Sequence, residues 1–305
     1  MSEKHPIPAG LNLLISLAQV LALLGLLRLA AMTSGLWLLL VGVAYALVMN
    51  SAYTMMHEAE HQLLHPKRWL NDLVGMVLAL FFPAPFHLAR QGHLGHHMRN
   101  RSDDEAFDFY FEGESKVWKF LQLYGVLTGL FWVVIVLTNV IAVFAPQILR
   151  SKAVRIDRPT AALLDSLNPG WLPLVRLEAA AAILLHAGLI WYWQIPVWHW
   201  VTTLCCYGAL WSAMQYVHHF GTQRDVIEGS VNLRTWPWLD AMWLNHTWHL
   251  RHHRHPTVPW IYLPELDEGP VDTREHMLAA YLRMWRGPKL THERIQNRHA
   301  GKIIR

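Results

Sequence analysis

Histidine is the residue type whose number and spacing in this sequence point to chemistry. There are 20 histidines in 305 residues, and many stand in pairs or short clusters. The stretch HEAEH, residues 57–61, satisfies the pattern H-E-x-x-H, which on a helix makes a zinc site with a glutamate base. The same five residues could instead be one of several histidine clusters that feed a larger metal centre. The remaining histidines decide between these two interpretations.

Two later stretches, HLGHH and HLRHH, share the pattern H-x-x-H-H. Residues four apart share one face of a helix, so His93 and His97 project together. His96 is turned about a third of a revolution away from them and can therefore reach a second metal. The pair His218-His219 should add one ligand, with His219 favoured. The nine expected metal ligands are His57, His61, His93, His96, His97, His219, His249, His252 and His253.

Nine imidazoles are too many for one zinc ion, which takes four ligands, but they suit two metals with four or five ligands each. A zinc protease would leave both H-x-x-H-H clusters without a role. A carboxylate-rich di-iron site of the soluble type needs a second E-x-x-H copy, and the sequence has none. Imidazole suits Zn, Cu, Fe and Ni alike, so the ligands alone do not name the metal.

Acidic residues near these clusters are candidates for holding imidazole N–H groups in place. Glu58 and Asp104 are the two that we expect to act at the catalytic site, in this supporting role. The wider set of such candidates is Glu58, Glu60, Asp103, Asp104 and Asp108.

The composition places these clusters beside a membrane. The chain is 53% hydrophobic and 16% charged, whereas an ordinary soluble chain carries roughly 25% charged residues. Its only cysteines, Cys205 and Cys206, are adjacent in an apolar run and offer no disulfide framework and no C-x-x-C pair. The modest net charge of +4 comes from basic residues beside apolar segments, which fits a membrane surface better than nucleic acid.

Six apolar stretches are candidates for membrane segments: Leu11–Ala31, Gly35–Met56, Leu73–Leu88, Phe120–Ala145, Leu174–Trp193 and Val197–Val217. A span needs about 20 mostly apolar residues. Leu73–Leu88 is short and contains FFPAPF, so we expect it to be re-entrant or interfacial. Basic clusters near residues 67–68, 90–101, 150–158 and 251–254 mark the cytoplasmic side. To keep all four on that side, Phe120–Ala145 must re-enter or lie along the interface.

The expected fold is therefore all-α. It is a multi-pass membrane helical domain with four full crossings, re-entrant or interfacial helices and a cytoplasmic cap that carries the histidine clusters. Residues 1–305 form this single domain, with the histidine core at about 35–266 and an interfacial or cytoplasmic tail at about 272–305. Within the tail, His276–Trp285 is expected to be an amphipathic interfacial helix. The first span is expected to be a retained anchor and not a signal peptide.

Three histidine boxes in the order H-x-x-x-H, H-x-x-H-H, H-x-x-H-H resemble the signature of the membrane-bound fatty acid desaturase and hydroxylase superfamily. The run HLRHHRHPTVPWIYLPEL, residues 249–266, is similar to the family's HH-x-x-P-x-x-P run, and the likeness covers roughly residues 35–266. His219 matches the family's additional histidine upstream of the third box. The first box departs from the family, because Glu58 stands where Asp is frequent.

The resemblance implies an O2-dependent, non-heme oxidase with two iron ions that acts on a fatty acid or fatty acyl substrate. The expected outcome is desaturation or hydroxylation. One branch of the family instead converts free fatty acids to terminal alkenes by oxidative decarboxylation, and carotenoid hydroxylases and ketolases are a third alternative. The basic residues that could hold an acidic head group are Lys67, Arg68, Arg90, Arg99 and Arg101, although the positive-inside bias explains them equally well.

The chain contains no recognisable fused electron carrier, so a separate donor is expected: a ferredoxin, a rubredoxin or a cytochrome b5-like protein. Membrane lipid is the other expected partner, and nucleic acid is not. The protein should lie in a bacterial inner membrane or the ER, with its histidine boxes on the cytoplasmic side. A membrane metal-handling or transport protein is the alternative from a different class. Transporters place ligands near the bilayer midplane, whereas every box here is expected at the cytoplasmic rim.

Overall fold

The structure, a computed structural model, describes residues 4–145, 147–148, 151–152, 157–266 and 274–304. Two predictions fall partly outside this range, namely the start of the tail near Asp272 and parts of the basic cluster from Arg150 to Arg158. The fold is mostly helical, as predicted, and the four strands within the described residues have two residues each.

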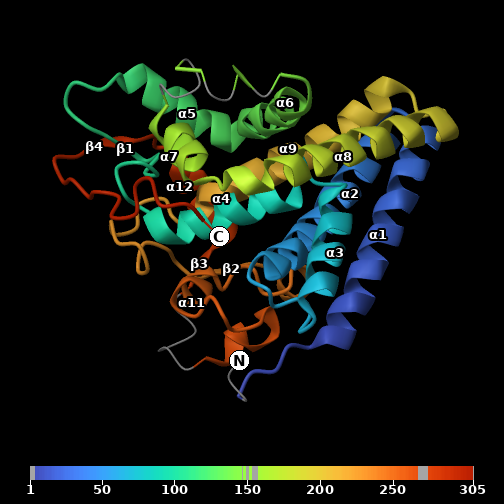
Figure 1. Cartoon of the computed structure of the whole chain (residues 1–305), viewed down its shortest axis with the longest axis horizontal. Helices are drawn as coiled ribbons and strands as arrows, with labels where there is room; N and C mark the ends of the chain where they lie inside the picture. The colour runs from blue at the N-terminus through green and yellow to red at the C-terminus, as the bar shows by residue number, and fades with distance from the viewer. Residues whose placement is uncertain (1–3, 146, 149–150, 153–156, 267–273, 305) are drawn as a thin grey trace.

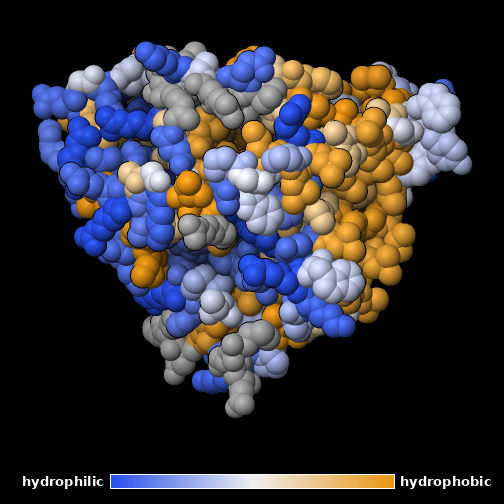
Figure 2. All heavy atoms as spheres, viewed as in Figure 1, coloured by the Kyte–Doolittle hydropathy of each residue, from blue (hydrophilic) through white to orange (hydrophobic). Residues whose placement is uncertain are grey.

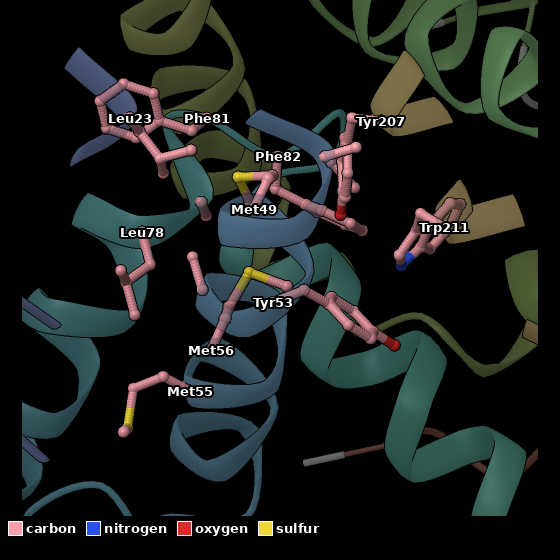
Figure 3. Close-up of a cluster of buried hydrophobic side chains, with 14 of the residues drawn as sticks. Leu23, Met49, Tyr53, Met55, Met56, Leu78, Phe81, Phe82, Tyr207 and Trp211 are labelled. Carbon is pink, nitrogen blue, oxygen red and sulfur yellow. The ribbon is translucent and has the colours of Figure 1, made fainter. Parts of the chain in front are cut away.

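Two long helical hairpins form the body of the molecule (Figure 1). The first joins α1 (Ala9–Met32) to α2 (Gly35–Glu60), and the second joins α8 (Leu172–Trp193) to α9 (Val197–Val217). Helix α2 packs against both α1 and α9. Apolar side chains of α2 and α9 fill this contact with Phe82 between them, as Tyr53, Phe82, Tyr207 and Trp211 illustrate in Figure 3.

Shorter helices surround these hairpins. They are α3 (Arg68–Ala79), α4 (Phe86–Arg99), α5 (Lys116–Thr128), α6 (Leu130–Phe144), α7 (Arg158–Ser166), α10 (Pro237–Met242), α11 (His249–Arg254) and α12 (Met277–Met284), together with the 3-10 turns η2 (Pro169–Trp171) and η3 (Trp260–Glu265). The strands pair in parallel as β1 (Phe109–Tyr110) with β4 (Lys289–Leu290), and β2 (Leu233–Arg234) with β3 (Glu275–His276). These pairings tie residues 109–110 and 233–234 to the C-terminal segment.

Three helices in the described residues are long and apolar enough to cross a membrane: Ala9–Met32, Gly35–Glu60 and Pro169–Trp193. A fourth candidate is the pair α5 and α6, which is apolar enough but bends by 88° at its break. The expected crossing Val197–Val217 forms a helix of 21 residues, α9, but it is not among these candidates.

Gly129 makes the sharp bend between α5 and α6. Its φ of +91° lies in the left-handed region, which favours glycine. A Cβ at this position would come within 3.1 Å of the Ala209 Cα on α9. The apolar stretch predicted at Phe120–Ala145 is therefore two helices, and the glycine lets the turn between them approach α9 closely.

Apolar side chains are exposed over one part of the surface. Figure 2 shows them gathered at the right of the view, where α1 and the far ends of α8 and α9 lie. Leu14 on α1 is 64% exposed, Trp37 on α2 is 71% exposed and Leu184 on α8 is 71% exposed. Apolar surface of this extent favours lipid over water as the surroundings of these helices. The left of the same view, over β1, β4 and α7, is largely hydrophilic.

The predicted interfacial helix His276–Trp285 corresponds to α12. Its buried residues Met277, Ala280 and Met284 pack with the last turns of α9, including Met214 and Val217. One face of α12 is thus covered by the protein itself, while Leu278 and Leu282 on the opposite side are exposed.

Candidate metal centre

Four helix ends bring the predicted ligands together. His57 lies in the last turn of α2, and His61 follows directly as its C-cap. Helix α4 carries the second box, and α11 begins at His249 and carries the third. His219 lies two residues after the end of α9. Because α2 packs against α4 and α9, these ends meet in one place.

The nine histidines form two groups, which we call the first group and the second group. The first group is His57, His61, His93, His97 and His252, and the second group is His96, His219, His249 and His253. Within each group one potential ligand atom from every residue lies within 4.8 Å of the others. Helical rotation explains the split of the boxes, because His93 and His97 share a face of α4 that His96 does not.

In the first group the Nε2 atoms converge on a common point. Nε2 of His61 lies 2.8 Å from Nε2 of His93, and Nε2 of His97 lies 3.0 Å from the same atom. Nε2 of His97 also lies 2.9 Å from Nε2 of His252.

The second group has the same geometry. Nε2 of His249 lies 3.0 Å from Nε2 of His219 and 3.2 Å from Nε2 of His253. Two nitrogens that each bind one ion at about 2.1 Å, at right angles to each other, are about 3 Å apart. The spacing in both groups is therefore what imidazoles around a metal ion require.

Burial lowers the pKa of several of these imidazoles and so favours the neutral form that binds metal. Removal from water lowers the pKa of His93 and His97 well below its usual value, and neighbouring imidazoles lower it further. The same two causes act on His249, His252 and His253. Burial lowers the pKa of His61 to about 3, with the Arg90 charge as a second cause. A neutral ring offers a lone pair to a metal, which a protonated ring does not.

Two imidazoles of the second group are held from behind through Nδ1. Nδ1 of His96 lies 3.1 Å from Oε1 of Glu105, and Nδ1 of His219 lies 2.8 Å from the carbonyl oxygen of Gly229. A proton on Nδ1 leaves Nε2 free to face the centre of the group. Burial would raise the pKa of the Glu105 carboxyl, but the Arg99 charge and His96 hold it below its usual value.

Glu105 is a carboxylate that the sequence did not single out, although its neighbours Asp103, Asp104 and Asp108 were named. Asp104 accepts a hydrogen bond from Asn297 at 3.0 Å, and Glu58 accepts one from the backbone N–H of Trp260 at 3.1 Å. In the described part of the chain, neither Glu58 nor Asp104 has a hydrogen bond to an imidazole.

The other acidic candidates have different partners or none. Asp103 accepts from Arg224 at 2.6 Å, and Asp108 accepts from Arg101 at 2.6 Å. Oε2 of Glu60 is buried and has no hydrogen-bond partner among the described residues. Of the five carboxylates named from the sequence, none has a hydrogen bond to an imidazole within the described ranges.

A buried network connects the end of α4 to the segment after α9. Arg101 is fully buried and donates to Asp108 and to the hydroxyl of Tyr216, both at 2.6 Å. Asp108 also accepts from the backbone N–H of Gly221 at 2.7 Å. Asn100 donates to the carbonyl oxygen of Gly229, the same atom that accepts from His219. The network thus fixes the distance between the second box and His219.

The basic residues considered for an acidic head group differ in accessibility. Arg90 pairs with Asp72 and Arg99 pairs with Glu105, and both arginines are buried, as is Arg101. Lys67 and Arg68 are exposed at the start of α3.

Two further histidines lie beside the groups. The ring of His218 stacks on that of His249 with centroids 4.7 Å apart, and its Nδ1 lies 3.2 Å from the carbonyl oxygen of Val231. His246 contacts rings of both groups. The two groups include neither of them. From the sequence, His246 was a residue that flanks the third box, expected either beside the ligands or at the surface; the structure places it beside the ligands.

These observations describe a mostly helical protein with apolar, membrane-length helices and two groups of buried and half-buried imidazoles suited to metal ions. Residues 34–287 match the sequence model of a protein family that is described as fatty acid desaturase. That match covers most of the chain, and the chain belongs to this family. No curated protein is similar enough to the chain to match it.

Proposed function

We propose that the protein is a membrane-bound, O2-dependent non-heme di-iron oxidase that oxidises C–H bonds of a fatty acyl chain. The observation that carries the proposal is the presence of two adjacent groups of imidazoles, each spaced as metal ligands are, in a chain of the fatty acid desaturase family. Desaturation and hydroxylation both begin with removal of hydrogen from carbon, so the proposal covers both outcomes.

The residues present fit two metal ions. Nine Nε2-bearing rings converge in groups of five and four, and the ring of His57 has two buried nitrogens with no hydrogen-bond partner among the described residues. Such orphaned nitrogens cost stability unless something binds them. We assign the first metal to His57, His61, His93, His97 and His252, and the second to His96, His219, His249 and His253. Iron bound there supplies the oxidising power toward an unactivated C–H bond, which protein side chains lack.

The surrounding residues prepare the site for that chemistry. Glu105 and the Gly229 carbonyl keep the Nδ1 protons of His96 and His219 on the outside of the second group. The aromatic residues Tyr53, Phe82 and Trp211 pack on the bundle side of the groups, where ring centroids lie 5.1 Å to 5.8 Å apart. Apolar rings of this kind exclude water from that side of the groups.

We further propose four crossings, with α9 as the fourth, and a histidine-bearing end on the cytoplasmic side. The bend of 88° between α5 and α6 supports a re-entrant or interfacial segment there. Exposed Lys67 and Arg68 then lie where anionic lipid head groups are available. A separate electron donor of the ferredoxin, rubredoxin or cytochrome b5 type supplies the electrons.

The test is expression in a host that is fed defined fatty acids, with gas chromatography of lipids and headspace in air and without oxygen. We expect unsaturated or hydroxylated acyl chains that require oxygen, and about two irons per purified chain. A variant with His96→Ala should lose the product, whereas His292→Ala, at an exposed position, should retain it. Zinc in place of iron, or no oxygen-dependent product from the wild type, would refute the proposal. A volatile terminal alkene would reveal the decarboxylase branch.

A further inference from the structure

His246 occupies a position between the two groups. Its ring centroid lies 5.6 Å from that of His57 in the first group and 5.6 Å from that of His249 in the second. It also lies 5.9 Å from the ring of Tyr53 and 6.1 Å from that of His218. No other histidine outside the two groups contacts a ring of each group in the described residues.

Nδ1 of His246 is buried and has no hydrogen-bond partner within the described ranges. A buried polar atom without a partner is destabilising, and such atoms in native proteins are usually satisfied by water or by a ligand. The ring of His218 lies beside that of His246, and its Nε2 is also buried and without a hydrogen-bond partner within the described ranges. Two neighbouring histidines beside the groups, His246 and His218, therefore each have a ring nitrogen without a partner.

A small cavity lies next to His246. It has a volume of about 10 Å³, and its lining includes His57 and His252 of the first group, together with Glu58 and His246. This is about the space that one water molecule requires, and a water also needs two or more polar partners. Of the named side chains, Glu58 and His246 carry polar atoms that a metal bound by the first group leaves available to a water.

The backbone before His246 is held in an unusual conformation. Leu244 and Asn245 have φ values of +52° and +57°, in the left-handed region that residues other than glycine adopt rarely. The surroundings maintain this strain, since Leu244 is buried and the Asn245 side chain donates to the carbonyl oxygen of Trp260 at 3.3 Å. Strain of this kind clusters at active sites. His246 follows directly after these two residues.

We propose that this cavity binds a water-sized oxygen ligand beside the first metal position, and that His246 holds this ligand by a hydrogen bond from Nδ1 without binding metal itself. The inference rests on the proposed di-iron function. It gives His246 a role in binding at the reaction site, because the first group already supplies five imidazoles and does not need a sixth.

Fluoride is a suitable probe, since it is water-sized, accepts hydrogen bonds and binds ferric iron. The full-length, iron-loaded protein in detergent is titrated with fluoride while its absorption spectrum is recorded. We expect His246→Phe to keep the iron content of the wild type and to weaken fluoride binding about tenfold, as loss of one hydrogen bond to a charged acceptor predicts. His246→Asn places an amide N–H near the former Nδ1 and should bind fluoride within about threefold of the wild type.

His292→Phe, a substitution at an exposed position, is the matched control and should change neither quantity. Loss of iron in either His246 variant would make this residue a ligand and overturn the inference. Unchanged fluoride affinity in an iron-loaded His246→Phe protein would overturn it as well. Both results leave the proposed function intact, whereas a wild-type chain that binds no iron would refute that function too.

Discussion

The two groups of imidazoles are held in different ways. In the second group, His96 and His219 are fixed from outside by Glu105 and by the Gly229 carbonyl. In the first group, no imidazole has a hydrogen bond to anything except another histidine within the described residues. Two rings of the second group are therefore held by protein groups outside it, whereas the rings of the first group depend on the helices that carry them and on one another.

Contacts between helices hold the first group in place. The side chain of Asn71 donates to the carbonyl oxygen of Ala59 at 2.9 Å, and Arg90 donates to the same atom at 3.0 Å. These bonds join the end of α2 to α3 and α4. They fix the backbones beneath His57, His61 and His93 but leave the rings to be oriented by their contacts with one another.

Removal of one imidazole should have the largest effect on the protein, and its effect on metal content should differ between the two groups. His249→Ala leaves three imidazoles in the second group, and we expect the metal content to fall from about two ions per chain to about one. His61→Ala leaves four in the first group, enough for a four-coordinate ion, so both metals should remain but one should be bound more weakly. Elemental analysis of purified protein after dialysis against a chelator measures this. Equal losses of metal in the two variants would contradict the difference between the first and second groups.

Breaking the buried ion pair behind the second group should have the next largest effect. Arg101→Met leaves Asp108 buried without its cation, which typically costs about 3–5 kcal/mol. Denaturant unfolding in detergent should show this loss, and the second metal should be lost before the first. The double variant Arg101→Met/Asp108→Asn removes the unpaired charge and should recover part of the stability. No recovery in that variant would show that the charge itself is not responsible.

Substitution of the outer carboxylate should have a smaller and more local effect. Glu105→Ala removes the acceptor for Nδ1 of His96, and loss of such a partner typically weakens metal binding about 10–100-fold. Asp104→Ala is the matched control, because Asp104 accepts from Asn297 and should leave the metal affinity unchanged. Glu105→Gln keeps an acceptor oxygen and should fall between the two. If Asp104→Ala proved the more harmful, the role assigned to Glu105 would be wrong.

The sequence predicted the helical fold and the family, because both follow from periodic patterns. Apolar runs of helical length predicted α1, α2 and α8, and spacing of four residues placed His93 and His97 on one face with His96 turned away. The ligand assignments remain predictions, and so do the four crossings and the cytoplasmic side.

What the sequence did not predict lies in irregular segments. Glu105 follows Arg101, whose φ of +60° belongs to a turn with no periodicity, so nothing distinguished it from Asp103 and Asp104. His246 follows two left-handed residues that only the tertiary structure maintains. The bend between α5 and α6 depends on Gly129, which looks like an ordinary residue of a long apolar run.

The smallest expected effect concerns the response of the first group to acid. Burial, followed by the Arg90 charge, lowers the pKa of His61 to about 3, whereas an unfolded histidine has a pKa of about 6.5. Below about pH 6.5 the unfolded chain therefore binds a proton that the folded chain does not. The stability of the metal-free protein is full above this pH and falls as the pH drops toward 3, by about 1.4 kcal/mol per unit for each such imidazole.

His61→Asn should make that slope shallower by the contribution of one group, and His292→Asn, at an exposed position, should change it little. The measurement is unfolding by denaturant of the metal-free wild type and variants between pH 7 and pH 5. Metal ions should oppose the loss while they remain bound, because only neutral imidazoles bind them. An identical slope in the wild type and in His61→Asn would mean that His61 is as accessible to protons in the folded chain as in the unfolded one. The first group would then not be the closed, helix-supported cluster that distinguishes it from the second.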